Sequence, residues 1–380
     1  MAGLALATAA GEGPGPTTQQ AYVKASNAGM NDQFGYAGAG VALAGDTLVV
    51  GAPGEDSSAK AVDGDQGDGL DPTPGNPQDG FDSGAAYVFW RYGSGWAQQA
   101  YLKSSDTAPY DLFGRAVAVS GDTVVVSAQG TDGKQEGVPY EGAVYVFVRD
   151  DGKWSRQARL EASNARYKTH FGTSVAISGD TLIVGAIGDG SAAGGVNGDP
   201  TDESALNAGA AYVFRRDGTK WSQQACLKAP APREFDEFGI AVAISGDTAV
   251  VGAVDAGAAS TKPGAKGKDR GSPITASNAE AGDQFGGAVA ISGGTVAAGA
   301  AQENSFASGI NGDQDSEFRG SVLRAPPISL RFRAPPPGQR SRRRLATARG
   351  RPRSGSSAIG RRTGRRWPSL GNPWPSSWPD

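Results

Sequence analysis

Short runs in which apolar and polar residues alternate return five times along the chain. Alternation with a period of two predicts a half-buried β-strand, and Gly-Asp or Gly-Gly between two such runs predicts a tight hairpin. Each copy therefore predicts two antiparallel strands. The copies read VALAGDTLVVGA at 41–52, FGRAVAVSGDTVVVSA at 113–128, FGTSVAISGDTLIVGA at 171–186, FGIAVAISGDTAVVGA at 238–253 and FGGAVAISGGTVAAGA at 285–300.

Three of the copies continue with a second pair of runs. Each has an aromatic β-rich run, a short polar turn, then Trp and another alternating run, as in GAAYVFWRYGSGWAQQAYL from Gly84, GAVYVFVRDDGKWSRQARL from Gly142 and GAAYVFRRDGTKWSQQACL from Gly209. One sheet of four strands cannot bury its faces alone, so the copies must stack. Radial stacking gives a β-propeller. We therefore predict an all-β fold, a β-propeller of four-stranded antiparallel blades.

The fourth and fifth copies are defective. The fourth lacks the aromatic run and its Trp, and the fifth keeps the pattern only to Glu317. We therefore expect an incomplete or open propeller. The segment AYVKASN at 21–27 resembles LEASN at 160–164, and we expect it to complete the last blade.

These patterns divide the chain into three parts. Residues 1–20 are expected to be a leader or signal-peptide remnant without order, residues 21–317 hold about five repeats of the propeller, and residues 318–380 form a disordered tail rich in Arg, Pro and Ser. No run of 18 apolar residues exists, so we expect no membrane span.

Charge separates the tail from the rest of the chain. Residues 318–380 hold 15 Arg, no Lys and one Asp, a net charge of +14, whereas the whole chain has −3, so the other 317 residues carry −17. Arg, Pro, Gly and Ala are what GC-rich codons give in a wrong reading frame, and we hypothesise that the tail is an out-of-frame translation. It contains no recognisable nucleic-acid module, so we predict no specific nucleic-acid partner.

The Phe-Gly starts and the ending Gly51-Ala52-Pro53 resemble the FG-GAP repeat over residues 21–317. That repeat builds the propeller head of integrin α chains and occurs in many secreted bacterial proteins. The resemblance implies an extracellular or cell-surface propeller, a monomer, that binds Ca²⁺ and acts without catalysis in adhesion or in binding a protein or extracellular-matrix-type ligand.

Loops between the second and third strands hold the candidate metal ligands. Hard cations such as Ca²⁺ prefer carboxylate, amide and carbonyl oxygens on a sharply bent, Gly-containing turn. The candidates are Asp63, Asp65, Asp68 and Asp71 in the first loop, Asn197, Asp199 and Asp202 in the third, and Asn311 and Asp313 in the fifth. The resemblance implies a calcium loop at this place, although the spacing of the first and third loops has one residue more than the integrin motif. The alternative is a solvated acidic turn.

Catalysis has little support in the sequence. His170 is the only His, and the aligned positions in other copies hold unrelated residues; the same is true of Cys226. The pair Glu55 and Asp56 is more typical of a loop ligand or surface charge than of acid catalysis. We expect no enzyme activity. Two alternatives stay open: a propeller that accompanies a hydrolase-type enzyme, and a degraded fragment without function.

Overall fold

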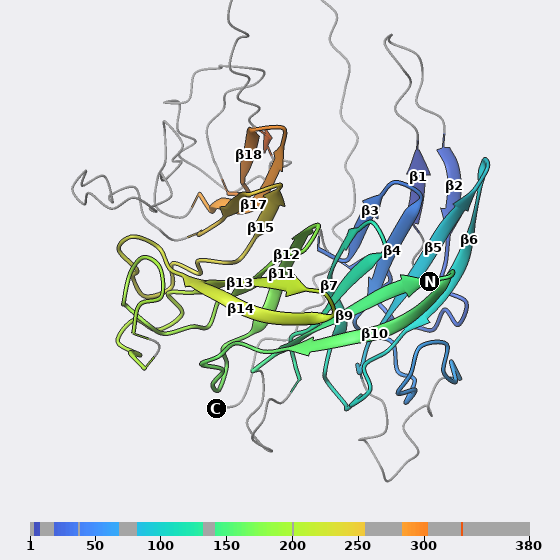
Figure 1. Cartoon of the computed structure of the whole chain (residues 1–380), viewed down its shortest axis with the longest axis horizontal. Helices are drawn as coiled ribbons and strands as arrows, with labels where there is room; N and C mark the ends of the chain where they lie inside the picture. Colours follow the sequence, from blue (N-terminus) through green and yellow to red (C-terminus); the bar gives the residue numbers. More distant parts are fainter. Residues whose placement is uncertain are drawn as a thin grey trace, which may run out of the picture. The chain divides into compact units, whose positions relative to one another are not determined.

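A computed structural model describes residues 4–7, 19–36, 39–67, 82–131, 141–199, 201–254, 283–302 and 328–329. The chain divides into two compact units, Met1–Ala334 and Pro335–Asp380, and all described residues belong to the first (Figure 1). These residues contain strands and turns but no helix, which confirms the all-β prediction. In particular, no helix in the described ranges is long and apolar enough to cross a membrane.

Three four-stranded antiparallel sheets form the blades predicted from the complete copies. Within each blade the strands are paired in chain order, and two-residue Gly-Asp turns join the first strand to the second. Blade 1 contains β3 (Val41–Ala44), β4 (Thr47–Ala52), β5 (Ala85–Tyr92) and β6 (Gly95–Leu102); blade 2 contains β7 (Phe113–Ser120), β8 (Thr123–Ala128), β9 (Ala143–Asp150) and β10 (Lys153–Leu160); blade 3 contains β11 (Phe171–Ser178), β12 (Thr181–Ala186), β13 (Ala210–Asp217) and β14 (Lys220–Leu227).

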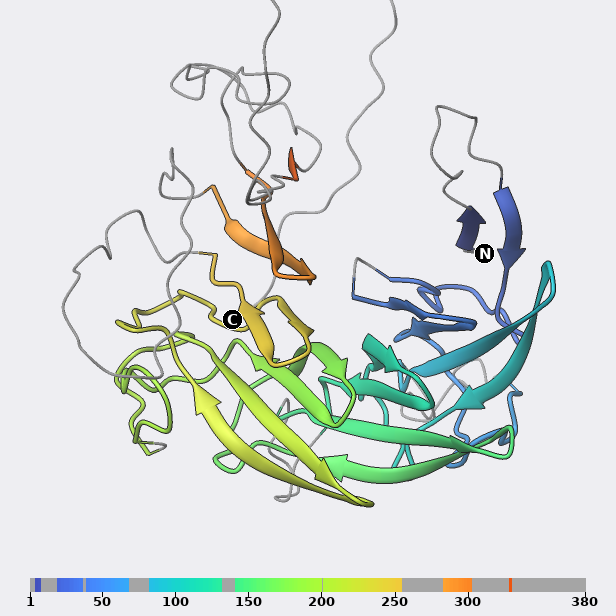
Figure 2. The same cartoon turned by 45° about the horizontal axis from the view of Figure 1, so that its top comes forward.

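The fourth and fifth sheets are smaller, as the sequence predicts. Blade 4 has β15 (Val242–Ser245) and β16 (Thr248–Val251), while blade 5 has β17 (Phe285–Ser292) and β18 (Thr295–Ala300), to which β19 (Ile328–Ser329) adds a short third strand. Successive first strands contact one another along the series β3, β7, β11, β15 and β17, which is the arrangement of an open propeller (Figure 2).

The N-terminal segment departs from one expectation. Strand β2 (Gln19–Val23) pairs with β1 (Leu4–Ala7), not with the last blade, so the prediction that this segment completes blade 5 is wrong for the described strands. The following residues instead lie against blade 1, where the Ser26 backbone N–H donates to Gln98 Oε1. Ser163 makes the equivalent bond to Gln223 of blade 3, so the leading segment takes the place that the end of a preceding blade would occupy.

The Phe-Gly and Gly-Ala elements of the repeat meet between blades. A Cβ added to Gly51 of blade 1 would lie 1.9 Å from the carbonyl oxygen of Gly114 in blade 2. The same 1.9 Å approach relates Gly185 to Gly239 and Gly252 to Gly286. Such contacts leave no room for a side chain, and they explain why Gly follows the Phe of each copy and a small residue precedes its final Ala.

Aromatic side chains fill each complete blade. Phe113 packs against Tyr145 and Phe147 of β9, with ring centroids 5.4 and 6.2 Å away. Phe34 and Phe171 make the same pair of contacts in blades 1 and 3. Edge-to-face aromatic pairs add to the free energy gained from burying the rings, so the Phe of Phe-Gly is the centre of each blade core.

Candidate functional site

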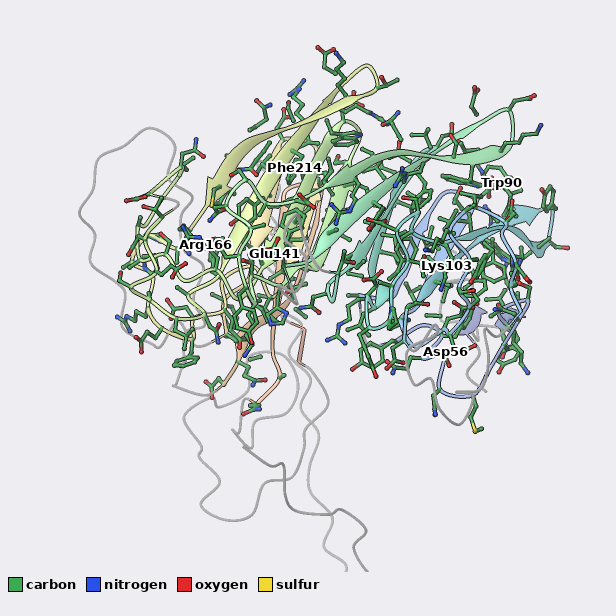
Figure 3. The ribbon with its side chains drawn as sticks, turned by 90° about the horizontal axis from the view of Figure 1, so that it is seen from below. Asp56, Trp90, Lys103, Glu141, Arg166 and Phe214 are labelled. Carbon is green, nitrogen blue, oxygen red and sulfur yellow. The ribbon has the colours of Figure 1, made fainter. Side chains whose placement is uncertain are left out.

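A buried ion pair closes the base of the loop that joins β4 to β5. Lys103 Nζ lies 2.7 Å from Glu55 Oε2, and both side chains are fully buried. Lys103 also donates to Ser83 Oγ at 2.7 Å, and Ser83 returns to the loop by donating to the carbonyl of Ser57. Figure 3 shows Lys103 among the strands of blade 1, with Asp56 in the adjoining loop. The pair therefore ties both ends of the loop to the residue that follows β6.

The remaining oxygen of Glu55 connects the loop to the N-terminal segment. Asn27 Nδ2 donates to Glu55 Oε1 at 2.9 Å, and Tyr87 Oη donates to Asn27 Oδ1 at 2.6 Å. Buried charges are tolerated when they are paired and their other lone pairs are hydrogen-bonded. This cluster satisfies both conditions.

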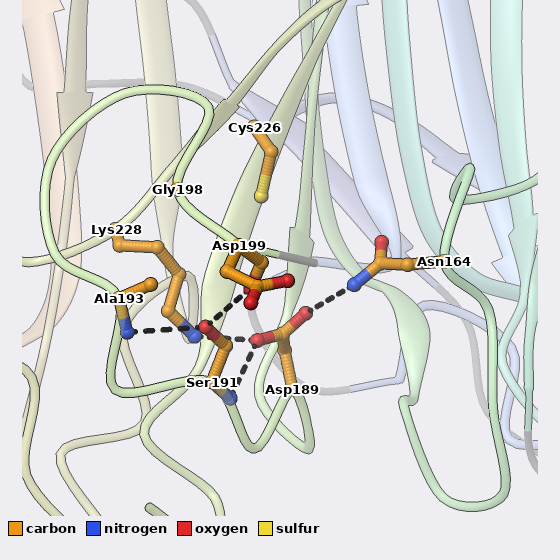
Figure 4. Close-up of a pocket in the computed structure, with 8 residues that line it drawn as sticks. All are labelled: Asn164, Asp189, Ser191, Ala193, Gly198, Asp199, Cys226 and Lys228. Atoms are coloured by element: carbon orange, nitrogen blue, oxygen red, sulfur yellow. Dashed lines mark hydrogen bonds and ion pairs between the residues drawn. The ribbon is translucent and has the colours of Figure 1, made fainter. Parts of the chain in front are cut away.

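Blade 3 repeats the cluster with different residues. Lys228 Nζ lies 2.5 Å from Asp189 Oδ1, and Asn164 Nδ2 donates to Asp189 Oδ2 at 3.1 Å (Figure 4). Tyr212 Oη is 2.8 Å from both Asn164 Oδ1 and Asp189 Oδ2. Asn164 follows the last strand of blade 2, so the cluster also fastens one blade to the next.

Blade 2 holds its charges in a different order. Thr131 replaces the acid of the loop, and Glu161 replaces the lysine. Arg159 supplies the cation, pairing with Glu161 and, at 2.9 Å from Nε to Oδ2, with Asp106, which accepts from Tyr145 Oη. Blade 2 therefore shares one cation between two carboxylates, whereas blades 1 and 3 each hold a one-to-one ion pair.

The surroundings shift the pKa values of these groups. Burial raises the pKa of Asp189, but the ammonium of Lys228 and hydrogen bonds from Lys228, Tyr212 and Ser191 outweigh it, so the pKa is lower than usual. Burial lowers the pKa of Lys103, and Glu55 opposes that change. Burial also raises the pKa of Cys226 to about 11, so its thiol stays protonated at neutral pH.

Two predicted metal ligands anchor their loops to the outer strand. The Tyr101 backbone N–H donates to Asp63 Oδ1 at 2.8 Å, and the Cys226 N–H donates to Asn197 Oδ1 at 2.9 Å. Asp63 and Asn197 both have a φ of 52°, a left-handed conformation that Asn and Asp tolerate better than most residues. Their equivalent places explain why an acid in one loop aligns with an amide in the other.

The other described candidates hydrogen-bond to their own loops. Asp65 Oδ1 accepts from Gly67 N, Asp199 Oδ1 from Thr201 N, and Asp202 Oδ2 from Ala192 N. In the described ranges no three acidic, His or Cys side chains gather as a metal site. Four candidates lie outside the described residues and stay predictions: Asp68, Asp71, Asn311 and Asp313.

A small pocket lies beside the blade 3 cluster. It has space for about one water molecule, and its lining includes Asp189, Ser191, Asp199, Cys226 and Lys228 (Figure 4). Two charged groups of this lining, the Asp189 carboxylate and the Lys228 ammonium, already neutralise each other in an ion pair. The pocket has room for water or a small polar group at the base of the loop.

Sequence reasoning did not identify either buried ion pair. It placed Glu55 as a loop ligand or surface charge, whereas Glu55 is fully buried, and it assigned no role to Lys103 or Lys228. The available signal was positional: a Lys follows the Leu that ends β6 and β14, and an acid stands three residues after the Ala that ends β4 and β12. Uncharged Thr131 and acidic Glu161 hide that signal in blade 2.

Comparison with known families matches the FG-GAP repeat to residues 17–68, 96–147, 154–214, 221–272 and 269–316. A search of curated proteins finds no matching sequence. The matched segments cover more than half of the 380 residues and include all five Phe-Gly starts. Together with the blades described above, they show that the chain belongs to the FG-GAP repeat family.

Proposed function

We propose that the protein is a non-catalytic, protein-binding propeller that presents the loops of blades 1 and 3 to an adhesion or matrix-type ligand. FG-GAP propellers generally mediate protein interactions. The observation that carries the proposal is the fully buried pair of Glu55 and Lys103 at the base of the first loop, repeated by Asp189 and Lys228 at the third. Binding residues are commonly placed on loops that a rigid scaffold holds.

Chemistry within the pocket supports a binding role over a catalytic one. A nucleophilic Cys needs a lowered pKa, whereas the pKa of Cys226 is raised to about 11. Lys228, the neighbouring amine, is held in an ion pair with Asp189. A hydrolase would need a free base or nucleophile at this place.

The same proposal places the protein outside the cell or at its surface. Its support is the family resemblance and the negative body of the chain, which carries −17 over 317 residues. Such a charge keeps a protein soluble and favours ligands with basic surfaces.

Calcium binding is a separate part of the proposal and concerns the first loop above all. Asp63 and Asp65 are exposed, and the Oδ1 atom of each accepts a hydrogen bond from a backbone N–H of the protein. A cation would also need Asp68 and Asp71. We expect millimolar Ca²⁺ to raise the melting temperature of the full chain, and Asp65→Asn to reduce that rise. An unchanged melting temperature would remove the metal claim and leave the binding claim intact.

The binding claim is tested by surface plasmon resonance against immobilised fibronectin, laminin and collagen. The loop variant Asp63→Asn/Asp65→Asn keeps the Oδ1 acceptors but removes two exposed charges. Asp150→Asn/Asp151→Asn removes the same charge from the exposed β9–β10 turn and serves as the matched control. We expect the loop variant alone to lose binding. Equal binding by the unchanged protein, the loop variant and the control variant contradicts the proposal. Absence of binding to all three ligands contradicts it as well.

A further inference from the structure

The second strand of blade 4 has an open edge among the described residues, where the second strands of blades 1 to 3 are paired. All residues of β4 and β8 are buried, because β5 and β9 cover their outer edges. In β16 the equivalent Thr248 and Ala249 are exposed, and Val250 and Val251 are half-buried. Among the described residues no strand pairs with this edge. An unpaired edge presents backbone N–H and C=O groups to any extended chain that can reach them.

The aromatic core of blade 4 is also incomplete. Phe238 stands where Phe113 and Phe171 stand, and those two rings are fully buried between a Tyr and a Phe of the third strand. Phe238 itself is half-buried. It lacks the two rings that its counterparts contact, so an aromatic side chain from elsewhere would cover the part of Phe238 that is left exposed.

The Gly-Asp turn of blade 4 carries an acidic residue that has an Arg partner in the complete blades. Asp46, Asp122 and Asp180, in the Gly-Asp turns of blades 1 to 3, pair with the Arg at the seventh position of the third strand. Asp247 occupies the same place in blade 4 and is exposed. No Arg or Lys of the described residues pairs with it, so an incoming Arg would find its usual partner.

Gln224 extends the open site onto blade 3. The indole N–H of Trp154 donates to Gln99 of blade 1, and that of Trp221 donates to Gln157 of blade 2, each at 2.8 Å. Gln224 is the equivalent acceptor on blade 3, and it is exposed whereas Gln99 and Gln157 are half-buried. The Trp that would reach it belongs to the strand pair that blade 4 lacks.

The Tyr-Val-Phe run of the complete blades occurs in the sequence only within β5, β9 and β13. Residues 255–282 contain one Ile and no Val, Leu, Met or aromatic residue, so they cannot supply the missing runs. The three suitable strands, β5, β9 and β13, are buried in their own blades, so a second copy would have to unfold to donate one. Because that run occurs nowhere else in the sequence, a partner chain is the donor that fits.

We propose that blade 4 accepts, by strand addition to β16, a β-hairpin from another protein that carries the pattern Ala-(Ala or Val)-aromatic-Val-Phe-x-Arg followed by Trp. The register follows blade 3, where Thr181 faces Arg215, Leu182 faces Phe214 and Val184 faces Tyr212. The partner's Phe then faces Ala249, its Arg reaches Asp247 and its Trp reaches Gln224. This site uses none of the loop residues and stands or falls apart from the proposed function.

The first aromatic position of the partner should be less selective than in the complete blades. Tyr87, Tyr145 and Tyr212 each direct their hydroxyl to Asn27, Asp106 or Asn164. The equivalent residue before blade 4 is Ala231, which offers no side-chain acceptor. Phe is therefore accepted as well as Tyr, because a Tyr hydroxyl would gain nothing at this place.

The test is fluorescence anisotropy of the full-length protein with a labelled peptide of sequence GAVYVFVRDDGKWSRQARL, residues 142–160 of this chain. We expect saturable binding, a change of less than about twofold for Tyr→Phe in the peptide, and loss of binding for its central Phe→Ala. Replacing the first Arg of the peptide, which corresponds to Arg149, by Gln should weaken binding about two- to fivefold, the range of exposed ion pairs. The protein variant Asp247→Asn should bind the original peptide and the Arg→Gln peptide with equal affinity, because the ion pair is already lost.

Several outcomes overturn the proposal. A scrambled peptide of the same composition that binds equally well would show non-specific association. Absence of saturation below about 1 mM would show that the edge is covered or inaccessible. A dimer in light scattering that the peptide dissociates would assign the edge to a second copy. Circular dichroism and the melting temperature of Asp247→Asn, a change at an exposed turn, control for misfolding.

Discussion

Equivalent residues in this chain meet different neighbours, and the tryptophans show the consequence. Trp154 and Trp221 donate their indole N–H groups to a Gln of the preceding blade. Trp96 holds the same place in blade 1, the first of the described blades, and its buried N–H has no acceptor among the described residues. The same residue type therefore gains a hydrogen bond in two blades and a desolvation cost in one.

Replacing the tryptophans by Phe separates these two situations. Both substitutions remove the same part of the indole ring, but Trp154→Phe also breaks the bond to Gln99, whereas Trp96→Phe removes an unsatisfied donor. We expect Trp154→Phe to cost about 1–3 kcal/mol more in the free energy of unfolding. Urea denaturation of both variants measures the difference, and equal losses would contradict this account.

Acid should destabilise the protein through Asp189. Its folded-state pKa is lowered, so its contribution to stability is present above the ordinary carboxyl range near pH 4 and is lost as the pH falls through the lowered value. We expect the melting temperature to fall below about pH 4, and to fall less steeply in Asp189→Asn, which lacks the titrating group. Parallel pH profiles for the two proteins would assign acid sensitivity to other groups.

At the scale of elements, local patterns predicted the strands well and the loop contacts poorly. Period-two alternation and Gly-Asp turns are local, and β7 with β8 or β11 with β12 lie where the alternation placed them. The pair of Glu55 and Lys103 joins residues 48 apart and depends on how the loop closes over β6. The bond from Tyr101 N to Asp63 depends on register between loop and strand, which residue types do not encode.

The close approach between blades gives a direct test at this scale. A Cβ on Gly51 would lie 1.9 Å from the Gly114 carbonyl oxygen, whereas a Cβ on Gly95 would meet nothing nearer than 3.8 Å. We expect Gly51→Ala to cost about 1–3 kcal/mol or more through overpacking and Gly95→Ala to cost less than about 0.5 kcal/mol. Thermal unfolding of the two variants decides; a neutral Gly51→Ala would contradict the contact.

At the scale of the whole molecule, the blades form a series in which each stabilises its neighbours. Blades 1 to 3 have complete sheets and buried clusters, while blade 4 keeps two strands and a half-buried Phe238. In repeat proteins stability is roughly the sum of each unit and its interfaces, so protection should fall along the series. The sequence of one repeat predicts one blade, but it does not predict how many blades close a ring.

The most direct test of this series is hydrogen exchange of the full-length protein, followed strand by strand with mass spectrometry. The account predicts slow exchange in β4, β8 and β12, whose residues are almost all buried, and much faster exchange in β16. Equally slow exchange in β16 and β12 would contradict the claim that blade 4 is open.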